Sequence, residues 1–141
     1  MRKRHWLLLM VYALFIVSCL TSCGKSEDKI KKEIDFTVCD KTRMPEELVE
    51  IIEEKKAKVF KLSYISSDYM YIAIGYGEKI RQNLNVVVED LYMTDNAIYV
   101  ETNLITKEQT EDGMDAGGES MYPYIVLKCE NYDLPVVFDI D

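Results

Sequence analysis

The stretch Tyr69–Tyr76, Tyr-Met-Tyr-Ile-Ala-Ile-Gly-Tyr, decides the fold class of this chain. In a β-strand every second side chain lies on the same face, so the even and odd positions of this stretch form two separate faces. One face carries Met70, Ile72, Ile74 and Tyr76, and the other carries Tyr69, Tyr71, Ala73 and Gly75. Similar strand patterns, separated by turn signals, occupy residues 34–38, 59–65, 84–93, 98–104, 122–129 and 134–140. Together with one helix they predict an α+β domain of about six to seven short, mostly antiparallel strands.

The strand pattern that begins at position 84 changes phase in its middle. Leu91, the next apolar residue of the same face after Val88, comes three positions further on instead of two or four. One extra residue near Glu89 and Asp90, a β-bulge, would produce this change. Residues 94–96 predict the hairpin turn that follows.

Residues 44–56 predict the single, N-terminal helix. The proline at position 45 suits the first helical position, Glu46 and Glu47 suit the positive first turn, and the two lysines at the end complement the negative end of the helix dipole. The apolar residues form one narrow stripe, so we expect the helix to pack on a sheet. The stripe consists of Leu48, Ile51 and Ile52.

The first 22 residues predict a signal peptide. A basic start is followed by an apolar run, residues 6–20, that as a helix would be about 22 Å long and so shorter than the ~30 Å hydrocarbon core of a bilayer. Leu20-Thr21-Ser22-Cys23 resembles the lipobox of bacterial lipoproteins, which implies diacylglycerol on the Cys23 sulfur and cleavage before Cys23. A second match ends at Cys19, but cleavage there would leave Leu20 in the linker. A plain signal peptide or a single-span anchor stays open as the alternative.

The polar residues 23–33 predict a tether between the lipid and a domain at residues 34–141. We therefore expect an extracytoplasmic protein that is anchored to a bacterial membrane by acyl chains such as palmitate on Cys23. The central nine residues of the tether, 24–32, span roughly 15–18 Å on average as a flexible coil, so the domain would stay near the membrane.

The charge and the rare residues argue against several functions. His5 and Trp6, the only residues of their kinds, lie in the predicted leader. Of the 17 basic residues, Arg2, Lys3 and Arg4 would leave with it, so 14 would remain against 25 acidic residues, a net charge of −11. A chain with no imidazole and an acidic surface is poorly suited to His-dependent hydrolysis, to a His-ligated metal site or to nucleic-acid binding. We expect no enzymatic activity, no cofactor and no metal.

Two cysteines would remain besides the lipidated one. Cys39 and Cys129 lie at strand ends and could form a disulfide in an oxidising exterior, or remain two buried thiols. The glycines around Tyr76 do not fit a phosphate loop and predict close backbone packing or a bulge. The acidic residues 107–120 predict a long exposed loop.

Tyrosine, with 10 residues, is the commonest aromatic residue of the chain. Two interpretations stay open for the tyrosines of the strands: packing against cross-strand neighbours, or a contact patch on a sheet face that the helix leaves uncovered. The candidate partner-binding residues, taken to share one face, are Tyr69, Tyr71, Tyr99, Tyr122 and Tyr124.

Residues 71–79 (YIAIGYGEK) and 121–128 (MYPYIVLK), with 134–138 (LPVVF) after them, resemble the C-terminal domain of the protease complex subunit PrcB family. The resemblance covers about residues 34–140. It implies a non-catalytic accessory subunit that binds and stabilises a surface protease. The family usually carries Thr-Gly-Gly-Tyr where this chain has Arg81, Gln82, Asn83 and Leu84. Without the two glycines a positive φ is no longer cheap at these positions, so the turn must be built differently here.

These observations predict an anchored, non-enzymatic accessory protein whose partner is a secreted or surface protease or another envelope protein. The contact would use a Tyr-rich sheet face or an exposed strand edge that accepts a peptide strand. The alternative is a module that binds cell-wall glycan or a small solute, with tyrosine rings stacked on sugar. A flat aromatic surface would favour the first function and a concave aromatic pocket the second.

Overall fold

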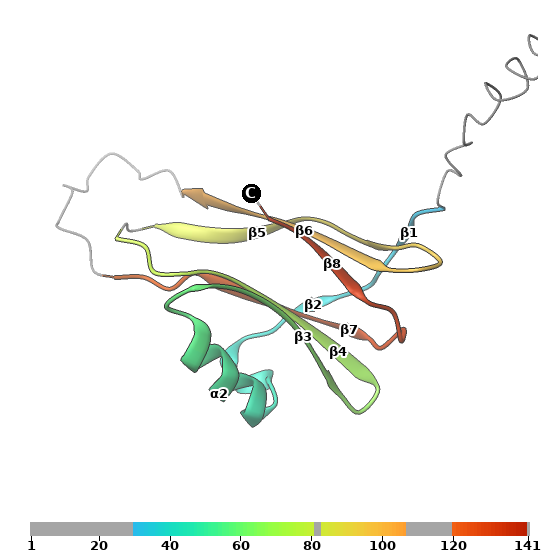
Figure 1. Cartoon of the computed structure of the whole chain (residues 1–141), viewed down its shortest axis with the longest axis horizontal. Helices are drawn as coiled ribbons and strands as arrows, with labels where there is room; N and C mark the ends of the chain where they lie inside the picture. The colour runs from blue at the N-terminus through green and yellow to red at the C-terminus, as the bar shows by residue number, and fades with distance from the viewer. Residues whose placement is uncertain (1–29, 81–82, 107–119, 141) are drawn as a thin grey trace, which may run out of the picture.

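The computed structural model describes residues 30–80, 83–106 and 120–140. The predicted signal peptide, Cys23, most of the tether, Arg81, Gln82 and most of the predicted 107–120 loop lie outside this range. The described residues form two four-stranded sheets stacked face to face, with one α-helix on the outside of one of them (Figure 1). The predicted α+β class and the mostly antiparallel pairing are confirmed. No helix in the described part of the chain has the length and apolar character needed to cross a membrane.

The strands divide between the sheets as follows. The β5 sheet has the order β1-β5-β6-β8, and the β4 sheet has the order β2-β7-β4-β3. The elements are β1 (Lys32–Glu33), β2 (Thr37–Val38), a short 3-10 helix (Lys41–Arg43), α2 (Glu46–Lys55), β3 (Val59–Ser66), β4 (Tyr69–Tyr76), β5 (Leu84–Met93), β6 (Ile98–Thr106), β7 (Tyr124–Glu130) and β8 (Val136–Ile140). All neighbouring pairs are antiparallel except β6 and β8, whose parallel pairing the sequence did not indicate.

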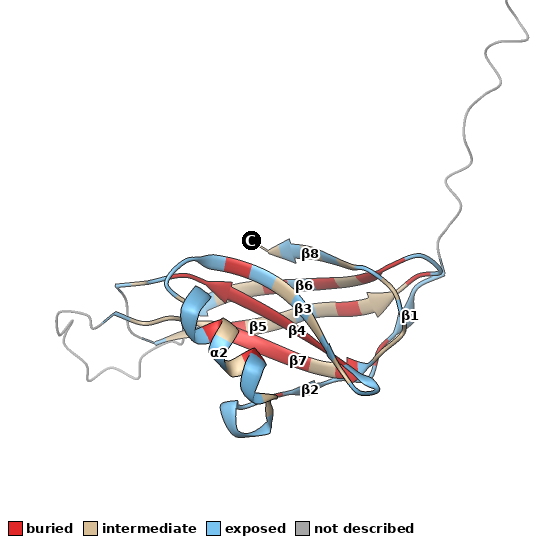
Figure 2. Ribbon diagram, turned by 60° about the horizontal axis from the view of Figure 1, so that its bottom comes forward, coloured by how far each residue is buried: buried red, intermediate tan, exposed pale blue. Residues whose placement is uncertain are grey.

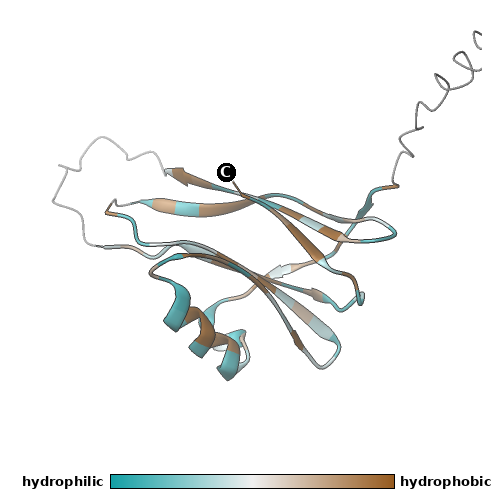
Figure 3. Ribbon diagram, viewed as in Figure 1, coloured by the Kyte–Doolittle hydropathy of each residue, from teal (hydrophilic) through white to brown (hydrophobic). Residues whose placement is uncertain are grey.

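Strand β4 lies inside its sheet and is buried on both faces (Figure 2). Its even positions face the β5 sheet, and they belong to the core between the sheets. Tyr71 and Ala73 face the other way and pack against α2. The two faces predicted for this strand are therefore confirmed, and they separate two apolar clusters. Figure 3 shows the apolar residues concentrated along the strands.

Helix α2 covers the outer face of the β4 sheet. Leu48 and Ile52 are fully buried against Phe60 and Val126, so two of the three residues of the predicted stripe form the packing face. Ile51, the third, is only partly buried. Pro45 precedes the helix as its N-cap residue rather than occupying the first helical position. Glu46 and Glu47 lie in the first turn, as predicted.

The glycines beside Tyr76 allow close packing, as predicted. A Cβ added at Gly75 would lie 2.1 Å from Cε1 of Phe60. Gly77 has φ +74°, and a Cβ there would lie 3.1 Å from the backbone nitrogen of Val59. These glycines let the β3 backbone and the Phe60 ring approach β4.

The predicted bulge in β5 is confirmed. The β5–β6 register shifts between Val88 and Asp90, which leaves Glu89 without a directly opposite residue. The hairpin closes through a hydrogen bond from the Thr94 backbone N–H to the Ala97 carbonyl oxygen, 2.9 Å long.

The single strand predicted at residues 34–38 is wrong. The chain pairs with β5 as β1, crosses the sandwich, and pairs with β7 as β2. Ile34 is buried between the sheets, while Phe36 and Val38 are 41% and 49% exposed. Only Thr37–Val38 of the predicted range forms a strand, because the chain leaves the β5 sheet after Glu33 and joins the β4 sheet at Thr37.

Candidate protein-contact surface

The five candidate tyrosines do not share one face, contrary to expectation. Tyr69, Tyr71 and Tyr124 lie on the α2 side of the β4 sheet, as the pairing of Gly75 with Tyr124 requires. Tyr99 lies in the other sheet, and Tyr122 precedes β7, with Lys56 Nζ 5.3 Å from its ring centroid. Periodicity assigns a side chain to a face of its own strand, but it does not say which sheet that strand joins.

On the α2 side, the tyrosines serve mainly as packing residues. Tyr71 is 6% exposed and meets Tyr64 edge to face, with ring centroids 6.4 Å apart. The Tyr64 hydroxyl donates a hydrogen bond to Glu47 Oε2 at 2.7 Å, which raises the pKa of Tyr64. Tyr124 is half-buried against the same cluster. The cross-strand packing interpretation therefore holds for these rings.

Tyr69 lies at the end of β4, beyond the cover of the helix. It is 45% exposed, and Lys128 Nζ lies 3.7 Å from its ring centroid. The lysine covers one face of the ring, in a cation–π contact.

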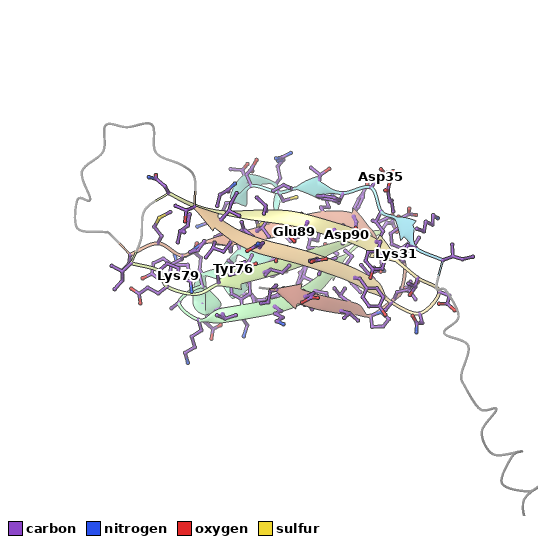
Figure 4. All side chains as sticks on the ribbon, turned by 90° about the horizontal axis from the view of Figure 1, so that it is seen from above. Lys31, Asp35, Tyr76, Lys79, Glu89 and Asp90 are labelled. Atoms are coloured by element: carbon purple, nitrogen blue, oxygen red, sulfur yellow. The ribbon has the colours of Figure 1, made fainter. Side chains whose placement is uncertain are left out.

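The outer face of the β5 sheet carries Tyr99, and no described helix or strand lies over it (Figure 4). Tyr92 of β5 is directly opposite Tyr99 of β6 in the register. The two rings are stacked with centroids 5.0 Å apart and an interplanar angle of 8°. Tyr92 was not among the candidate residues, because a turn at 94–96 would place it opposite Ile98, whereas the observed turn, one residue longer, places it opposite Tyr99.

Three further side chains surround the stacked rings. Lys31 Nζ lies 4.0 Å from the Tyr92 ring centroid and 3.6 Å from Asp90 Oδ2. Val137 of β8 is the register neighbour of Tyr99 and is 44% exposed. We call Lys31, Asp90, Tyr92, Tyr99 and Val137 the Tyr92–Tyr99 patch.

A row of carboxylates borders this patch. Asp90, Glu101 and Asp139 are successive partners across β5, β6 and β8. Glu89, which directly precedes Asp90 in β5, accepts a hydrogen bond from Asn103 Nδ2 at 3.1 Å. The patch and its border thus combine an aromatic pair, the exposed Val137 and a row of carboxylates. Among the residues that the structure describes, no group of three or more His, Cys, Asp or Glu side chains could hold a metal ion.

Neighbouring side chains cover the Tyr92 ring of the patch. One face of Tyr92 is covered by Tyr99 and a lysine lies over the same ring. A sugar that stacks on tyrosine needs an uncovered ring face, whereas a protein partner can pack against ring edges. A hollow of about 310 Å³ lies instead between the end of α2 and the start of β3, and Phe60 is the one aromatic residue of its lining.

Of the two alternatives for Cys39 and Cys129, the structure has the two buried free thiols and not the disulfide. Cys39 belongs to the cluster under α2, whereas Cys129 belongs to the core between the sheets. The β4 sheet therefore separates the two sulfur atoms. Burial, with a smaller contribution from Glu130, raises the pKa of Cys129 to about 11.

Of the four positions where the chain departs from the Thr-Gly-Gly-Tyr element, Asn83 and Leu84 are described. Asn83 has φ +63°, and asparagine is one of the few residues other than glycine that adopt this conformation readily. Positive φ is thus achieved in this turn without glycine. No family model matches the sequence, and neither a curated protein nor a solved structure matches it.

Proposed function

We propose that this protein is a membrane-anchored extracytoplasmic lipoprotein that binds another protein as a non-catalytic accessory subunit. The partner is a secreted or surface protease. The observation that carries this proposal is the stacked pair of Tyr92 and Tyr99 on an uncovered sheet face. The resemblance to the PrcB family supports the identity of the partner, and the lipobox supports the anchor.

The geometry of the patch suits protein recognition. Tyrosine is among the residues that contribute most to binding energy at protein interfaces. Stacking and the contact with Lys31 already restrict the rotamers of Tyr92, so binding would cost less conformational entropy than it would with free rings. The carboxylate row around the patch favours a partner surface that carries lysine or arginine.

The patch lies where the tether joins the domain. Lys31 belongs both to the predicted tether and to the patch, one residue before β1. A partner bound here would be held close to the lipid anchor. The accessory role we propose is therefore to keep the partner at the membrane surface.

Affinity capture from the native envelope tests this function. The full chain, its Tyr92→Ala/Tyr99→Ala variant and a control variant, Tyr69→Ala, are recovered after gentle cross-linking. We expect one envelope protein to be recovered with the wild type and with the control, and to be lost with the double variant. Recovery of no protein from any sample would contradict the proposal, and variant-sensitive retention of cell-wall glycan would favour the glycan-binding alternative.

Mass spectrometry of the mature N-terminus tests the anchor separately. We expect a chain that begins at Cys23 and carries acyl chains on that residue. A mature chain that retains His5, or one without an acyl group, would contradict the proposed location.

A further inference from the structure

Strand β3 is an eight-residue strand at the edge of the β4 sheet, and among the described strands it pairs with β4 alone. The backbone N–H of Tyr76 donates to the carbonyl oxygen of Pro123, on the β7 side, at 2.9 Å. The N–H and C=O of Val59, the register partner of Tyr76, point in the opposite direction, away from β4. Backbone groups alternate in direction along a strand, so every second residue of β3 shares this direction. The residues whose N–H and C=O face outward are Val59, Lys61, Ser63 and Ile65.

The side chains of these four residues are exposed as well. Val59 and Ile65, near the two ends of the strand, are 59% and 55% exposed. Their register partners, Tyr76 and Met70, place them on the side of the β5 sheet. An unpaired edge with apolar residues at both ends is a surface on which another strand can pair. The order of the residues in β3 indicates which strand would pair with this edge.

The sequence of β3 is complementary to itself in the antiparallel direction. If two copies are related by a two-fold axis at Leu62, Val59 of each copy lies opposite Ile65 of the other, and Phe60 lies opposite Tyr64. Lys61 lies opposite Ser63, so no two lysines are directly opposite. An axis at residue 61 would pair Lys61 with Lys61, and an axis at residue 63 would pair Lys61 with Ile65. Both pairings are less favourable than that of Lys61 with Ser63.

Charges beyond the strand fit the same arrangement. Antiparallel pairing brings the start of one β3 beside the end of the other, where Asp68 lies in the turn to β4. Lys55 and Lys58 precede β3, and both are exposed. None of these three residues takes part in an ion pair within the described parts of the chain. The basic end of one copy would therefore meet the acidic turn of the other.

We infer that two copies of this protein pair through their β3 strands, in antiparallel register about Leu62, to form a continuous eight-stranded sheet. The occupant of the free edge is a second copy of the chain. The Tyr92–Tyr99 patch lies on the other sheet and stays accessible in this dimer, so the inference does not depend on the proposed function.

Cysteine cross-linking tests the register. At the two-fold axis the two Leu62 residues form a pair without mutual backbone hydrogen bonds, the arrangement in which opposite Cβ atoms come close enough for a disulfide. We expect Leu62→Cys in the purified full chain, under mild oxidation, to give a covalent dimer. Thr37→Cys, on the opposite edge of the same sheet, is the control and should remain monomeric. Failure of Leu62→Cys to cross-link, or equal cross-linking of both variants, would overturn the inference.

A proline on the free edge tests the pairing itself. The N–H of Ser63 faces outward, so Ser63→Pro removes no hydrogen bond within one chain but removes two symmetric bonds from the dimer. Sedimentation of the full chain in detergent should show a dimer, and Ser63→Pro should raise its dissociation constant roughly ten- to a hundredfold. A monomeric wild type, or a folded variant that dimerises as tightly as wild type, would overturn the inference. If this variant does not fold, the cross-linking result decides.

Discussion

The hydroxyl groups of Tyr76 and Thr102 lie 3.0 Å apart in the interior and form a hydrogen bond between the two sheets. Tyr76 belongs to β4 and Thr102 to β6, and they are 7% and 1% exposed. The bond fixes one sheet relative to the other within an otherwise apolar core. Buried polar groups keep such a bond because an unsatisfied one is costly.

Removal of the Tyr76 hydroxyl should destabilise the protein. We expect Tyr76→Phe to lower the free energy of unfolding by about 1–3 kcal/mol, because the Thr102 hydroxyl loses this partner in the core. Thr102→Val removes the same bond from the other side. Denaturant unfolding of both variants and of the double variant measures the coupling, and the double variant should lose less than the sum of the two. Additive losses would show that the hydrogen bond does not link the sheets energetically.

Gly75 should tolerate no larger residue while Phe60 is present. The Cβ of an alanine at position 75 would overlap the Phe60 ring, so we expect Gly75→Ala to cost about 1–3 kcal/mol. In a Phe60→Leu background the same substitution should cost clearly less, since the ring is gone. Thermal unfolding of the four proteins tests this, and an equal cost in both backgrounds would contradict the proposed overlap.

Glu53 should make stability depend on pH in acid. Hydrogen bonds from Lys41, at 2.8 Å, and from Lys56 lower the pKa of Glu53 from 4.5 to about 2. Because the folded state favours the ionised form of Glu53, its two contacts contribute fully to the free energy of unfolding above pH 4.5. This contribution is lost as the pH falls to about 2 and the carboxylate is protonated. We expect the difference in unfolding free energy between wild type and Glu53→Gln to shrink over this range. A difference that stays constant from pH 6 to pH 2 would contradict the assigned ion pairs.

The two free cysteines should be unreactive in the folded protein. Cys39 and Cys129 are 7% and 3% exposed, and the raised pKa of Cys129, about 11, keeps its thiol protonated at pH 8. We expect iodoacetamide to label both residues only after unfolding, as located by peptide mass spectrometry. Labelling of either residue in the native state would contradict its burial. A peptide that links Cys39 to Cys129 by a disulfide would contradict their placement on opposite sides of the β4 sheet.

The features that the sequence predicts correctly are those encoded by local periodicity. The alternation in Tyr69–Tyr76 gives the two faces of β4, and the phase change after Val88 gives the bulge opposite β6. The stripe of Leu48 and Ile52 gives the packing face of α2. Each of these signals lies within ten residues and needs no knowledge of neighbouring strands.

The features that the sequence does not predict depend on which strands become neighbours. The division into two sheets separates Tyr99 from Tyr71 and splits the strand predicted at residues 34–38. It also places Cys39 and Cys129 in different clusters, although both lie at strand ends. For the same reason the candidate contact surface is not on the α2 side of the β4 sheet, where Tyr71 lies. It is on the outer face of the β5 sheet, where Tyr99 lies.

Site-specific photo-cross-linking tests the central claim, that the Tyr92–Tyr99 patch binds a protein partner, most directly. A benzophenone amino acid replaces Val137, which adjoins Tyr99, in the full chain in its native envelope, and the control carries it at the exposed Glu50 of α2. We expect one cross-linked envelope protein from position 137 and none from position 50. No adduct from position 137, or the same adducts from both positions, would contradict it.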